Sequence, residues 1–413
     1  MTLPPDAQRA YTPITLGPLT LRNRFIKSAT NEGMAKGGVP SKLLVEHHRS
    51  MAAGGVGMTT VAYCATSPDG RTFEDQVTLD DATLPHLRAL TDAVHREGGA
   101  ACAQITHGGA FNFLPRLSTK YPWSASSGFN AAGVLSGRLF RTGMTERDMD
   151  TIAQEFVAAA QRAKACGFDA VELHMGHGYL LSQFLSPVYN KRRDAYGGPP
   201  AQRARFPAQV LKRVLDAVGR DLAVTCKIGV TEGCKGGGTA ADAVEVARVL
   251  EREGAHLLVL SGGMNVESPW AIFGSPMPAA AVEAIQNPVV KLATRLMRLT
   301  APTVTFRELY FLEHSRQVRA AVRMPLAYLG GAKSVAGIEA VMKDGFDCVV
   351  MGRALIHDPA LVGKFASGEV TVSGCTACND CVAMMYTPGG TRCVLRPAGD
   401  VDSLNRIPAA ASA

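Results

Sequence analysis

Two histidines and a tyrosine lie close together in the stretch VELHMGHGYLLSQFL, residues 171–185. His174 ends an apolar run, and His177 and Tyr179 follow it in a glycine-broken loop. Two hydrogen-bond donors aimed at a carbonyl oxygen stabilise negative charge that develops on that oxygen. A phenol with a pKa of about 10 is neutral at about pH 7 and can donate a proton. The i, i+3, i+5 spacing lets one loop present all three groups, so the stretch predicts a site that polarises and protonates a substrate.

Each of these residues also has a structural interpretation. A single histidine in such a place is often a buried structural residue whose ring nitrogens are hydrogen-bonded within the protein. Tyr179 alone could pack on the following helix as an amphipathic cap. The grouping of all three in one loop favours chemistry over packing.

Polar residues and glycines also stand at the ends of other apolar runs. They are Gln104 in AQITHGG, Lys227 in TCKI, Gly330 and Gly331 in YLGGAKS, and Gly352 and Arg353 in VMGRAL. After the last two strands of many barrels, backbone N–H groups and a helix N-terminus bind phosphate. Arg353 could add a charge-assisted hydrogen bond to the same group. The two glycine pairs therefore predict a phosphate-bearing ligand, although a lone glycine after a strand is usually only a turn.

Eight short apolar runs set the expected architecture. They span residues 23–29, 57–63, 100–106, 170–174, 222–228, 256–261, 325–330 and 347–352. Amphipathic segments such as 148–167 and 239–254 lie between them. Strands that alternate with helices form a parallel sheet covered by helices, and eight of them favour a closed (β/α)8 TIM barrel. An open Rossmann sheet would need a GxGxxG turn after its first strand, which is missing. Because chemistry gathers at the C-terminal ends of barrel strands, the polar strand ends would share the barrel mouth.

The sequence divides into a barrel, residues 1–365, and a short cysteine-containing C-terminal extension, residues 366–413. Residues 262–324 are too long for one simple crossover. The segment GGMNVESPWAIFGSP near their start is predicted to form a loop over the barrel mouth. We expect the part from Met264 to Pro278 to shape substrate choice.

The composition excludes several classes of protein. Of 413 residues, 46% are hydrophobic and 19% are charged, as in a globular protein with a large core. The net charge of +7 comes without a block of like charges, so no nucleic-acid partner is expected. The N-terminus lacks the pattern of a secretory signal, and no apolar run is long enough to span a membrane. We therefore expect a cytoplasmic protein with no membrane partner; assembly as a homo-oligomer is left open.

Four of the ten cysteines cluster near the C-terminus. Cys375, Cys378, Cys381 and Cys393 form a CxxCxxC…C pattern. A short loop with this spacing can wrap three thiolates around one metal. Three interpretations stay open, namely a 4Fe–4S cluster, a zinc ion, or reduced cysteines without a metal.

Longer motifs carry a family resemblance. They are LGPLTLRNRFIKSAT, GGVGMTTVAYCATSPDGR, AQITHGG, CGFDAVELHMGHGYLLSQFLSPVYNKRRDAYGG and GGAKSVAGIEAVMKDGFDCVVMGRALIHDP, all within residues 10–365. With them the chain resembles the Old Yellow Enzyme family of FMN-dependent oxidoreductases, in its NADH:flavin oxidoreductase/NADH oxidase branch. The HxxHGYLxxQFLSP…NxRxDxYGG run is highly specific. The resemblance implies a (β/α)8 barrel with FMN across its C-terminal mouth and NADH or NADPH as the reductant.

The resemblance also implies roles for individual residues. The family's first strand-end loop, which wraps the flavin ring, falls on Ser28, Ala29, Thr30 and Asn31. Gln104 matches a glutamine that hydrogen-bonds the flavin pyrimidine edge, and Gly331, Gly352 and Arg353 match phosphate-binding positions. His174 and His177 match a pair that holds a substrate carbonyl oxygen, and Tyr179 matches a proton donor.

Three positions depart from the family pattern. Lys227 stands where many relatives have an arginine beside flavin N1 and the C2 carbonyl, and a lysine supplies the charge without the planar fork. Asn31 stands where relatives often have a threonine or cysteine near flavin O4. Tyr63, close to the flavin, takes a position that is commonly glycine or alanine. These departures affect the tuning of the flavin and leave the reaction class intact.

The expected activity is FMN-dependent, NAD(P)H-driven reduction of activated C=C bonds in small enone-type substrates. A hydride acceptor must be an electron-poor carbon, so the two histidines would polarise the conjugated carbonyl and Tyr179 would protonate the other carbon. One alternative is an iron–sulfur flavoprotein related to 2,4-dienoyl-CoA reductase and trimethylamine dehydrogenase. In those relatives a large C-terminal dinucleotide domain passes electrons through the cluster. Only about twenty residues follow Cys393 here, so this protein would need an external electron donor. A second alternative is a non-catalytic barrel that binds FMN or another small ligand.

Overall fold

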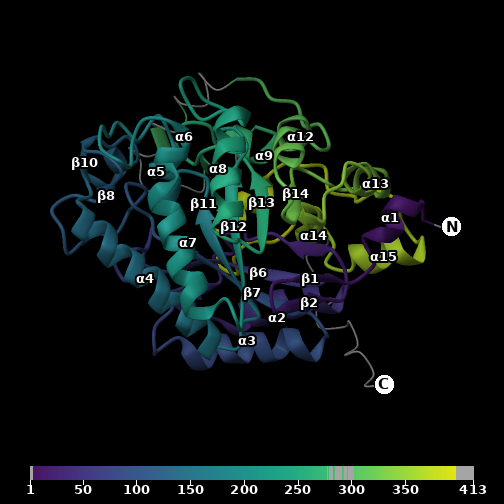
Figure 1. Cartoon of the computed structure of the whole chain (residues 1–413). Coiled ribbons are helices and arrows are strands. Elements are labelled where there is room, and N and C mark those ends of the chain that lie inside the picture. The colour runs from purple at the N-terminus through teal and green to yellow at the C-terminus, as the bar shows by residue number, and fades with distance from the viewer. Residues whose placement is uncertain are drawn as a thin grey trace.

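Eight parallel strands form the centre of the computed structural model, which describes residues 3–276 and 302–396, together with 278, 282–283, 291–292 and 295. Within these residues the strands close into a barrel (Figure 1). In order around the barrel they are β3 (Phe25–Lys27), β6 (Met58–Ala65), β7 (Ala100–Thr106), β11 (Ala170–Met175), β12 (Ala223–Gly229), β13 (Leu257–Ser261), β14 (Leu326–Leu329) and β15 (Cys348–Met351). Each strand overlaps one of the eight predicted runs, so the predicted (β/α)8 barrel is confirmed.

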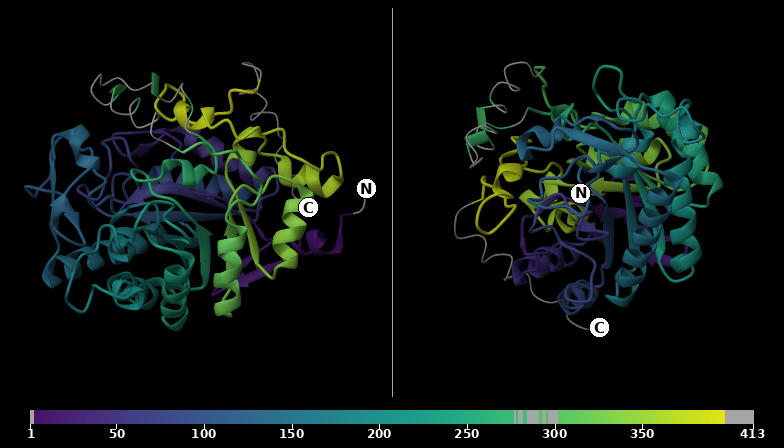
Figure 2. Two further views of the ribbon diagram at one scale, coloured as in Figure 1. Left: turned by 90° about the horizontal axis from the view of Figure 1, so that it is seen from above. Right: turned by 90° about the vertical axis from the view of Figure 1, so that its left-hand side faces the viewer.

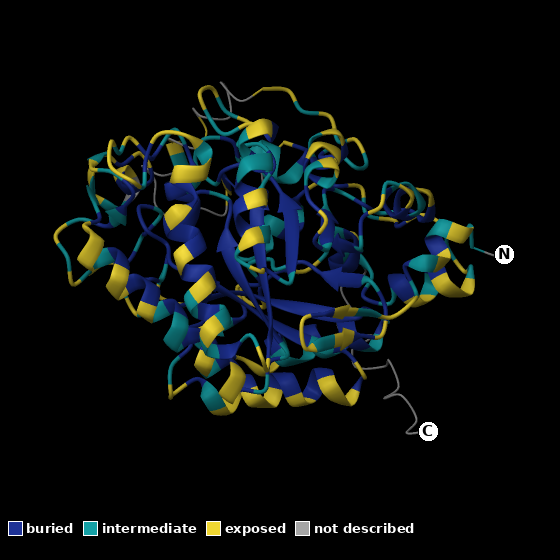
Figure 3. Cartoon of the chain, viewed as in Figure 1, coloured by how far each residue is buried: buried dark blue, intermediate teal, exposed yellow. Residues whose placement is uncertain are grey.

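Helices follow the strands and cover the outside of the barrel. In chain order they are α2 (Lys42–Ala53), α3 (Leu84–Arg96), α4 (Glu146–Ala165), α7 (Arg205–Val218), α8 (Ala240–Arg252), α12 (Leu312–Ala321), α13 (Val335–Lys343) and α15 (Leu361–Ser367). Figure 3 shows that α4 and α7 turn buried residues toward the strands and exposed residues toward solvent. The predicted amphipathic segments 148–167 and 239–254 correspond to α4 and α8. Both helices begin with a capping box, at Thr145 and Thr239, which satisfies the first free N–H groups.

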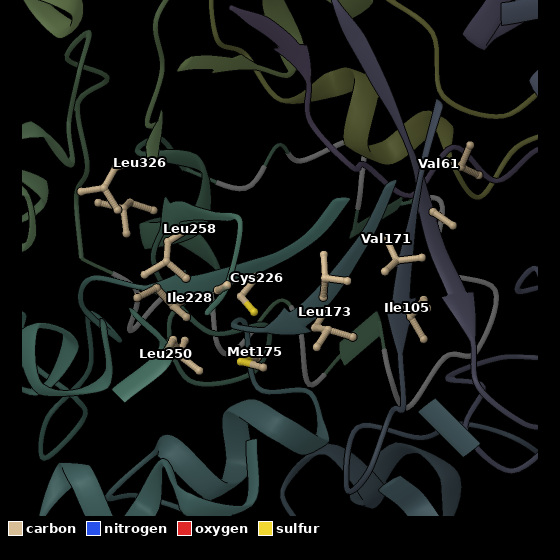
Figure 4. Packing of buried hydrophobic residues seen from close by; sticks show 14 of the residues in the cluster. Val61, Ile105, Val171, Leu173, Met175, Cys226, Ile228, Leu250, Leu258 and Leu326 are labelled. Atoms are coloured by element: carbon tan, nitrogen blue, oxygen red, sulfur yellow. The ribbon is translucent and has the colours of Figure 1, made fainter. Parts of the chain in front are cut away.

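The barrel strands alternate between two kinds of side chain. On β11, Val171, Leu173 and Met175 belong to the main hydrophobic cluster of the protein (Figure 4). Successive side chains of a strand point to opposite faces, so Glu172 and His174 point into the barrel. The outward residues stabilise the packing of strands on helices, and this leaves the inward positions available for polar groups.

The N-terminal end of the barrel is closed by an apolar plug. The plug is a hairpin of β1 (Ile14–Leu16) and β2 (Leu19–Leu21). Its Leu16 and Leu21 cluster with Ala170, Ala223 and Leu257, which are the first residues of β11, β12 and β13. These side chains are almost fully buried. The opposite end, where the strands finish, is therefore the end at which a ligand can enter the barrel.

Shorter helices and strands lie in the segments that connect or flank the barrel strands and helices. They are α1 (Pro5–Arg9), β4 (Ala35–Lys36), β5 (Val39–Pro40), β8 (Trp123–Ser124), β9 (Gly128–Phe129), the 3-10 helix η1 (Ala132–Ser136), β10 (Phe140–Gly143), α5 (Leu180–Leu185), α6 (Pro200–Arg203), α9 (Pro269–Phe273), α14 (Arg353–His357) and α16 (Asp380–Met384). Among the described residues no helix is both long enough and apolar enough to cross a membrane.

The C-terminal extension packs against loops at the strand ends. The Ser373 N–H donates to the Lys333 carbonyl (2.8 Å), and the Thr391 N–H donates to the Glu32 carbonyl (2.6 Å). The Thr391 hydroxyl also donates to the Asn31 carbonyl (2.8 Å). Figure 2 shows this segment, in yellow, lying against the barrel. Residues 397–413 of the predicted extension lie outside the described residues.

At Gly33 this packing requires a glycine, because a side chain would not fit. Its φ is +62°, and a Cβ added there would overlap the carbonyl oxygen of Met385 in the extension. We expect Gly33→Ala to lower the free energy of unfolding by about 1–3 kcal/mol more than Gly37→Ala. Gly37 has nearly the same φ, +59°, but a Cβ there would meet nothing within 4 Å. Urea unfolding and limited proteolysis of the extension would test this, and equal losses from the two variants would contradict the contact.

Candidate active site

A cavity of about 800 Å³ opens at the C-terminal ends of the barrel strands. This volume is ordinary for a cofactor or small-molecule site. Twelve residues predicted for catalysis or cofactor binding line it: Ser28, Ala29, Thr30, Asn31, Tyr63, Gln104, His174, His177, Tyr179, Gly331, Gly352 and Arg353. Cys375 and Cys381 of the extension line it too, whereas Lys227, Gly330, Cys378 and Cys393 are not among its lining residues.

Three rings meet on one side of the cavity. The ring centroid of His174 lies 5.0 Å from that of His177 and 4.6 Å from that of Tyr179. His174 is the last residue but one of β11, and a tight Gly176–Gly178 turn brings the chain back so that Tyr179 stands at the start of α5. Within this turn His177 has φ = +61°, a conformation that a non-glycine residue adopts at a cost. The loop therefore gathers the three side chains as the sequence predicted.

The hydrogen bonds of the two imidazoles limit which atoms can serve a substrate. His174 Nδ1 accepts from the Gly176 N–H (3.3 Å), so the neutral ring carries its proton on Nε2. His177 Nε2 lies 2.9 Å from Ser261 Oγ. If the serine hydroxyl donates to Nε2, the N–H of His177 is on Nδ1. Each ring can then offer one N–H donor.

Burial keeps all three groups uncharged near neutral pH. Desolvation lowers the pKa of His174 well below its usual value, with the nearby His177 and Lys227 adding to the effect. Desolvation, together with Lys227, lowers the pKa of His177 to about 3. Desolvation raises the pKa of Tyr179 to about 12, although the neighbouring side chains of Tyr63 and Asn265 act to lower it. The site therefore holds neutral donors and a protonated phenol.

The depressed pKa of His177 predicts a pH-dependent stability. In the unfolded chain a histidine takes up a proton below about pH 6.5, whereas folded His177 does so only near pH 3. Between these values the unfolded state binds more protons, so the free energy of unfolding falls as the pH falls. We expect His177→Asn, which cannot titrate, to remove up to about 1.4 kcal/mol per pH unit of that fall. Urea unfolding at a series of pH values would show it, and identical slopes for both proteins would contradict it.

Inside the barrel, Gln104 and Lys227 share one carboxylate. Gln104 Nε2 donates to Glu172 Oε1 (2.7 Å), and Lys227 Nζ lies 2.9 Å from the same oxygen. All three side chains are buried. The sequence analysis missed Glu172, although its place two residues before His174 puts both on the same face of β11. The position of Lys227 beside a flavin stays a prediction.

A second buried ion pair lies under the loop of residues 28–31. Lys27 Nζ is paired with Glu32 Oε1 and also donates to Thr30 Oγ1 (3.1 Å). Thr30 Oγ1 in turn donates to the Glu32 carboxylate (3.0 Å), and His48 Nε2 lies 3.9 Å from it. Glu32 and Thr30 both line the cavity. The sequence analysis did not single out Lys27 or Glu32, because a lysine at a strand end and a glutamate in a loop usually face solvent.

The glycine end of the cavity suits a phosphate. Gly331 has φ = +81°, and a Cβ there would come within 2.8 Å of Tyr310 and 3.0 Å of Phe306. The Arg353 guanidinium donates to Ser275 Oγ (3.0 Å), to the Phe273 carbonyl (2.6 Å) and to the side-chain oxygen of Asn379. No salt bridge joins Arg353 to a carboxylate within the described residues. A cation held only by neutral oxygens, beside glycines that leave space, fits an anionic group from a ligand.

The four C-terminal cysteines are not arranged as a metal site. The pKa of the Cys381 thiol is raised by burial and, less strongly, by Cys375, Cys378 and Cys393. Cys393 Sγ also lies 3.2 Å from His357 Nδ1. In the part of the chain that the structure describes, however, no group of three or more His, Cys, Asp or Glu side chains could hold a metal ion. The metal assignment of these cysteines is therefore not supported by the geometry.

Comparison with known proteins places the chain in a family. Residues 9–269 match the NADH:flavin oxidoreductase / NADH oxidase family. The chain belongs to this family. The Old Yellow Enzyme resemblance is thereby confirmed, and membership implies FMN as cofactor with NADH or NADPH as reductant.

Individual relatives give further context. The chain is 42% identical to 4,4'-dithiodibutanoate disulfide reductase of Rhodococcus erythropolis over 94% of this chain and 95% of that protein. It is 27% identical to the multifunctional alkene reductase/demethylase of Caballeronia cordobensis over 86% of this chain but only 48% of that protein. An old yellow enzyme homologue from Zymomonas mobilis shares the fold, with a TM-score of 0.69 at 20% identity over 92% of this chain and 98% of that one.

Proposed function

We propose that the protein is an FMN-dependent NAD(P)H reductase that reduces activated C=C bonds of α,β-unsaturated carbonyl compounds. The observation that carries the proposal is the group of His174, His177 and Tyr179 in one cavity with the predicted flavin-binding loop. The chemistry that FMN would supply here, when bound, is the transfer of a hydride from NADH or NADPH to an electron-poor carbon.

The cavity offers groups that fit this cofactor. Arg353 and the space at Gly331 would hold the phosphate, and the Gln104 amide would face the pyrimidine edge of the flavin. Residues 28–31 would lie along the ring. The buried Glu172 carboxylate orients Gln104, since it accepts the hydrogen bond of the amide.

The three rings would act on the second substrate. Neutral His174 and His177 each donate one N–H to the carbonyl oxygen, and this stabilises the negative charge that develops there. Tyr179 donates its phenolic proton to the carbon that becomes basic. The buried surroundings strengthen these hydrogen bonds, because little water competes for them.

The loop after β13 would select the substrate. Four residues of this loop line the cavity, namely Asn265, Pro269, Ile272 and Phe273. An isolated parallel β-bridge also pairs Met264 with His177. Within the predicted stretch Met264–Pro278, Met277 lies outside the described residues. Exchange of this loop with that of a relative should change substrate preference, and an unchanged preference would count against the hypothesis.

A second candidate activity is the reduction of a disulfide. It is favoured by the 42% identity to a disulfide reductase, which extends over nearly the whole of both chains. Cleavage of R–S–S–R by two electrons releases two thiolates, and the same Tyr179 could protonate one of them.

One assay separates the candidates. Purified protein, with FMN, would be supplied anaerobically with NADH or NADPH and with either cyclohexenone or 4,4'-dithiodibutanoate, and the products quantified. We expect saturated ketone as the faster product. Thiol as the sole product would assign the disulfide activity, and oxidation of neither nicotinamide would leave a non-catalytic ligand-binding barrel. Iron analysis of the same sample decides the iron–sulfur alternative.

A further inference from the structure

Tyr63 stands beside Tyr179 in the cavity. It belongs to β6, and its ring centroid lies 5.2 Å from that of Tyr179. The two side chains are only 7% and 6% exposed, and they form a small apolar cluster with Ala62, which Phe73 and Phe111 support. The Tyr63 hydroxyl lies 2.8 Å from Thr72 Oγ1.

The hydrogen bonds around Thr72 fix the direction of the Tyr63 proton. Gln76 Oε1 accepts from both the N–H of Thr72 (2.5 Å) and its hydroxyl (3.0 Å), while Gln76 Nε2 donates to the Tyr63 carbonyl (3.0 Å). Because the one hydroxyl proton of Thr72 goes to Gln76, Thr72 Oγ1 can only accept from Tyr63. The Tyr63 proton therefore points to Thr72 while Tyr179 is neutral. Once Tyr179 has lost its own proton, its phenolate oxygen is a charged acceptor to which the Tyr63 hydroxyl can donate instead.

We propose that Tyr63 is a positioning residue that turns its hydroxyl from Thr72 to the phenolate left on Tyr179 by proton donation. This inference rests on the proposed function. In the step itself the O–H bond of Tyr179 breaks and a C–H bond forms with the electron pair of the substrate enolate. The O–H electron pair stays on Tyr179, and a proton from water later restores the phenol.

The electrostatic surroundings of Tyr179 support this role. Burial raises its pKa to about 12, and the neighbouring Tyr63 hydroxyl is the largest effect that lowers it. The other titratable groups that face it are His174 and His177, both kept neutral by burial, and Tyr386 of the extension, which raises the pKa. A neutral hydroxyl donor is thus the main stabiliser that the cavity offers to the phenolate.

The test compares three variants in the half-reaction with cyclohexenone. Tyr63→Phe keeps the ring packing and removes the hydroxyl, so it should slow enone reduction about ten- to a hundredfold, the effect of one hydrogen bond to a charged group. It should slow reduction by NADH far less than it slows enone reduction, and it should move the alkaline limb of the pH profile of enone reduction to higher pH. In a Tyr179→Phe background it should have no further effect. Thr72→Val frees the Tyr63 proton, so it should not slow the reaction.

Each opposite result would overturn the inference. An unchanged rate in Tyr63→Phe, or an equal slowing in the Tyr179→Phe background, would show that Tyr63 does not act through Tyr179. If the wild-type protein reduces no enone, the proposed function fails separately. The ultraviolet titration of the Tyr179 phenol then decides: Tyr63→Phe must raise its pKa, and an unchanged pKa excludes the hydrogen bond.

Discussion

Tyr179→Phe should slow enone reduction by about 10²- to 10⁴-fold, the usual contribution of a positioned general acid. The phenylalanine ring keeps the contacts that Tyr179 makes with Tyr63, Phe111 and His174. Only the proton donor is lost, so reduction of the flavin by NADH should remain nearly unchanged. Anaerobic stopped-flow measurement of each half-reaction separates the two effects.

A matched control is available in the same cavity. Tyr386 also lines it, but its side chain is 64% exposed and it comes from the extension. Tyr386→Phe removes a hydroxyl without removing the proposed donor, so enone reduction should stay close to the wild-type rate. Equal loss of both half-reactions in Tyr179→Phe would contradict the donor role of Tyr179, since it would indicate damage to the cofactor site.

Glu172→Ala should lower the free energy of unfolding by about 3–5 kcal/mol, because it leaves the Lys227 ammonium buried without its partner. The Glu172 and Lys227 side chains are only 5% and 2% exposed, so water cannot replace the carboxylate. The Gln104 amide loses its acceptor in the same variant. FMN content of the purified protein should fall as well, because Gln104 is then no longer held in place.

The double variant Glu172→Ala with Lys227→Met provides the control. It removes both charges, and burial of an apolar side chain in place of the ion pair should recover most of the lost stability. FMN content should remain low, since Gln104 still lacks its acceptor. Urea unfolding and cofactor absorbance measure the two quantities, and a loss below about 1 kcal/mol for Glu172→Ala alone would show that the pair is weak.

The strands and the mouth of the barrel could be predicted because each follows from local chemistry. Val171, Leu173 and Met175 alternate with polar residues along β11, and this pattern requires one apolar face. His174 and His177 could be placed because the end of an apolar run coincides with a turn built on two glycines. Such signals are contained in a few adjacent residues.

Other features depend on residues that are distant in the sequence. Glu172 binds Gln104 and Lys227 from two neighbouring strands, and no spacing in the sequence reveals that meeting. The docking of Thr391 on Glu32 is likewise invisible until the barrel is closed. The cysteines show the reverse case, because their spacing suggests a metal site that the described side chains do not form.

The most direct test of the central claim is an anaerobic absorption spectrum of the purified protein, recorded before and after addition of NADH or NADPH and again after cyclohexenone. The proposed function predicts flavin bands that bleach with the nicotinamide and return with the enone, in step with formation of the saturated ketone. A protein without flavin bands, or one whose reduced flavin is not reoxidised by the enone, would contradict it.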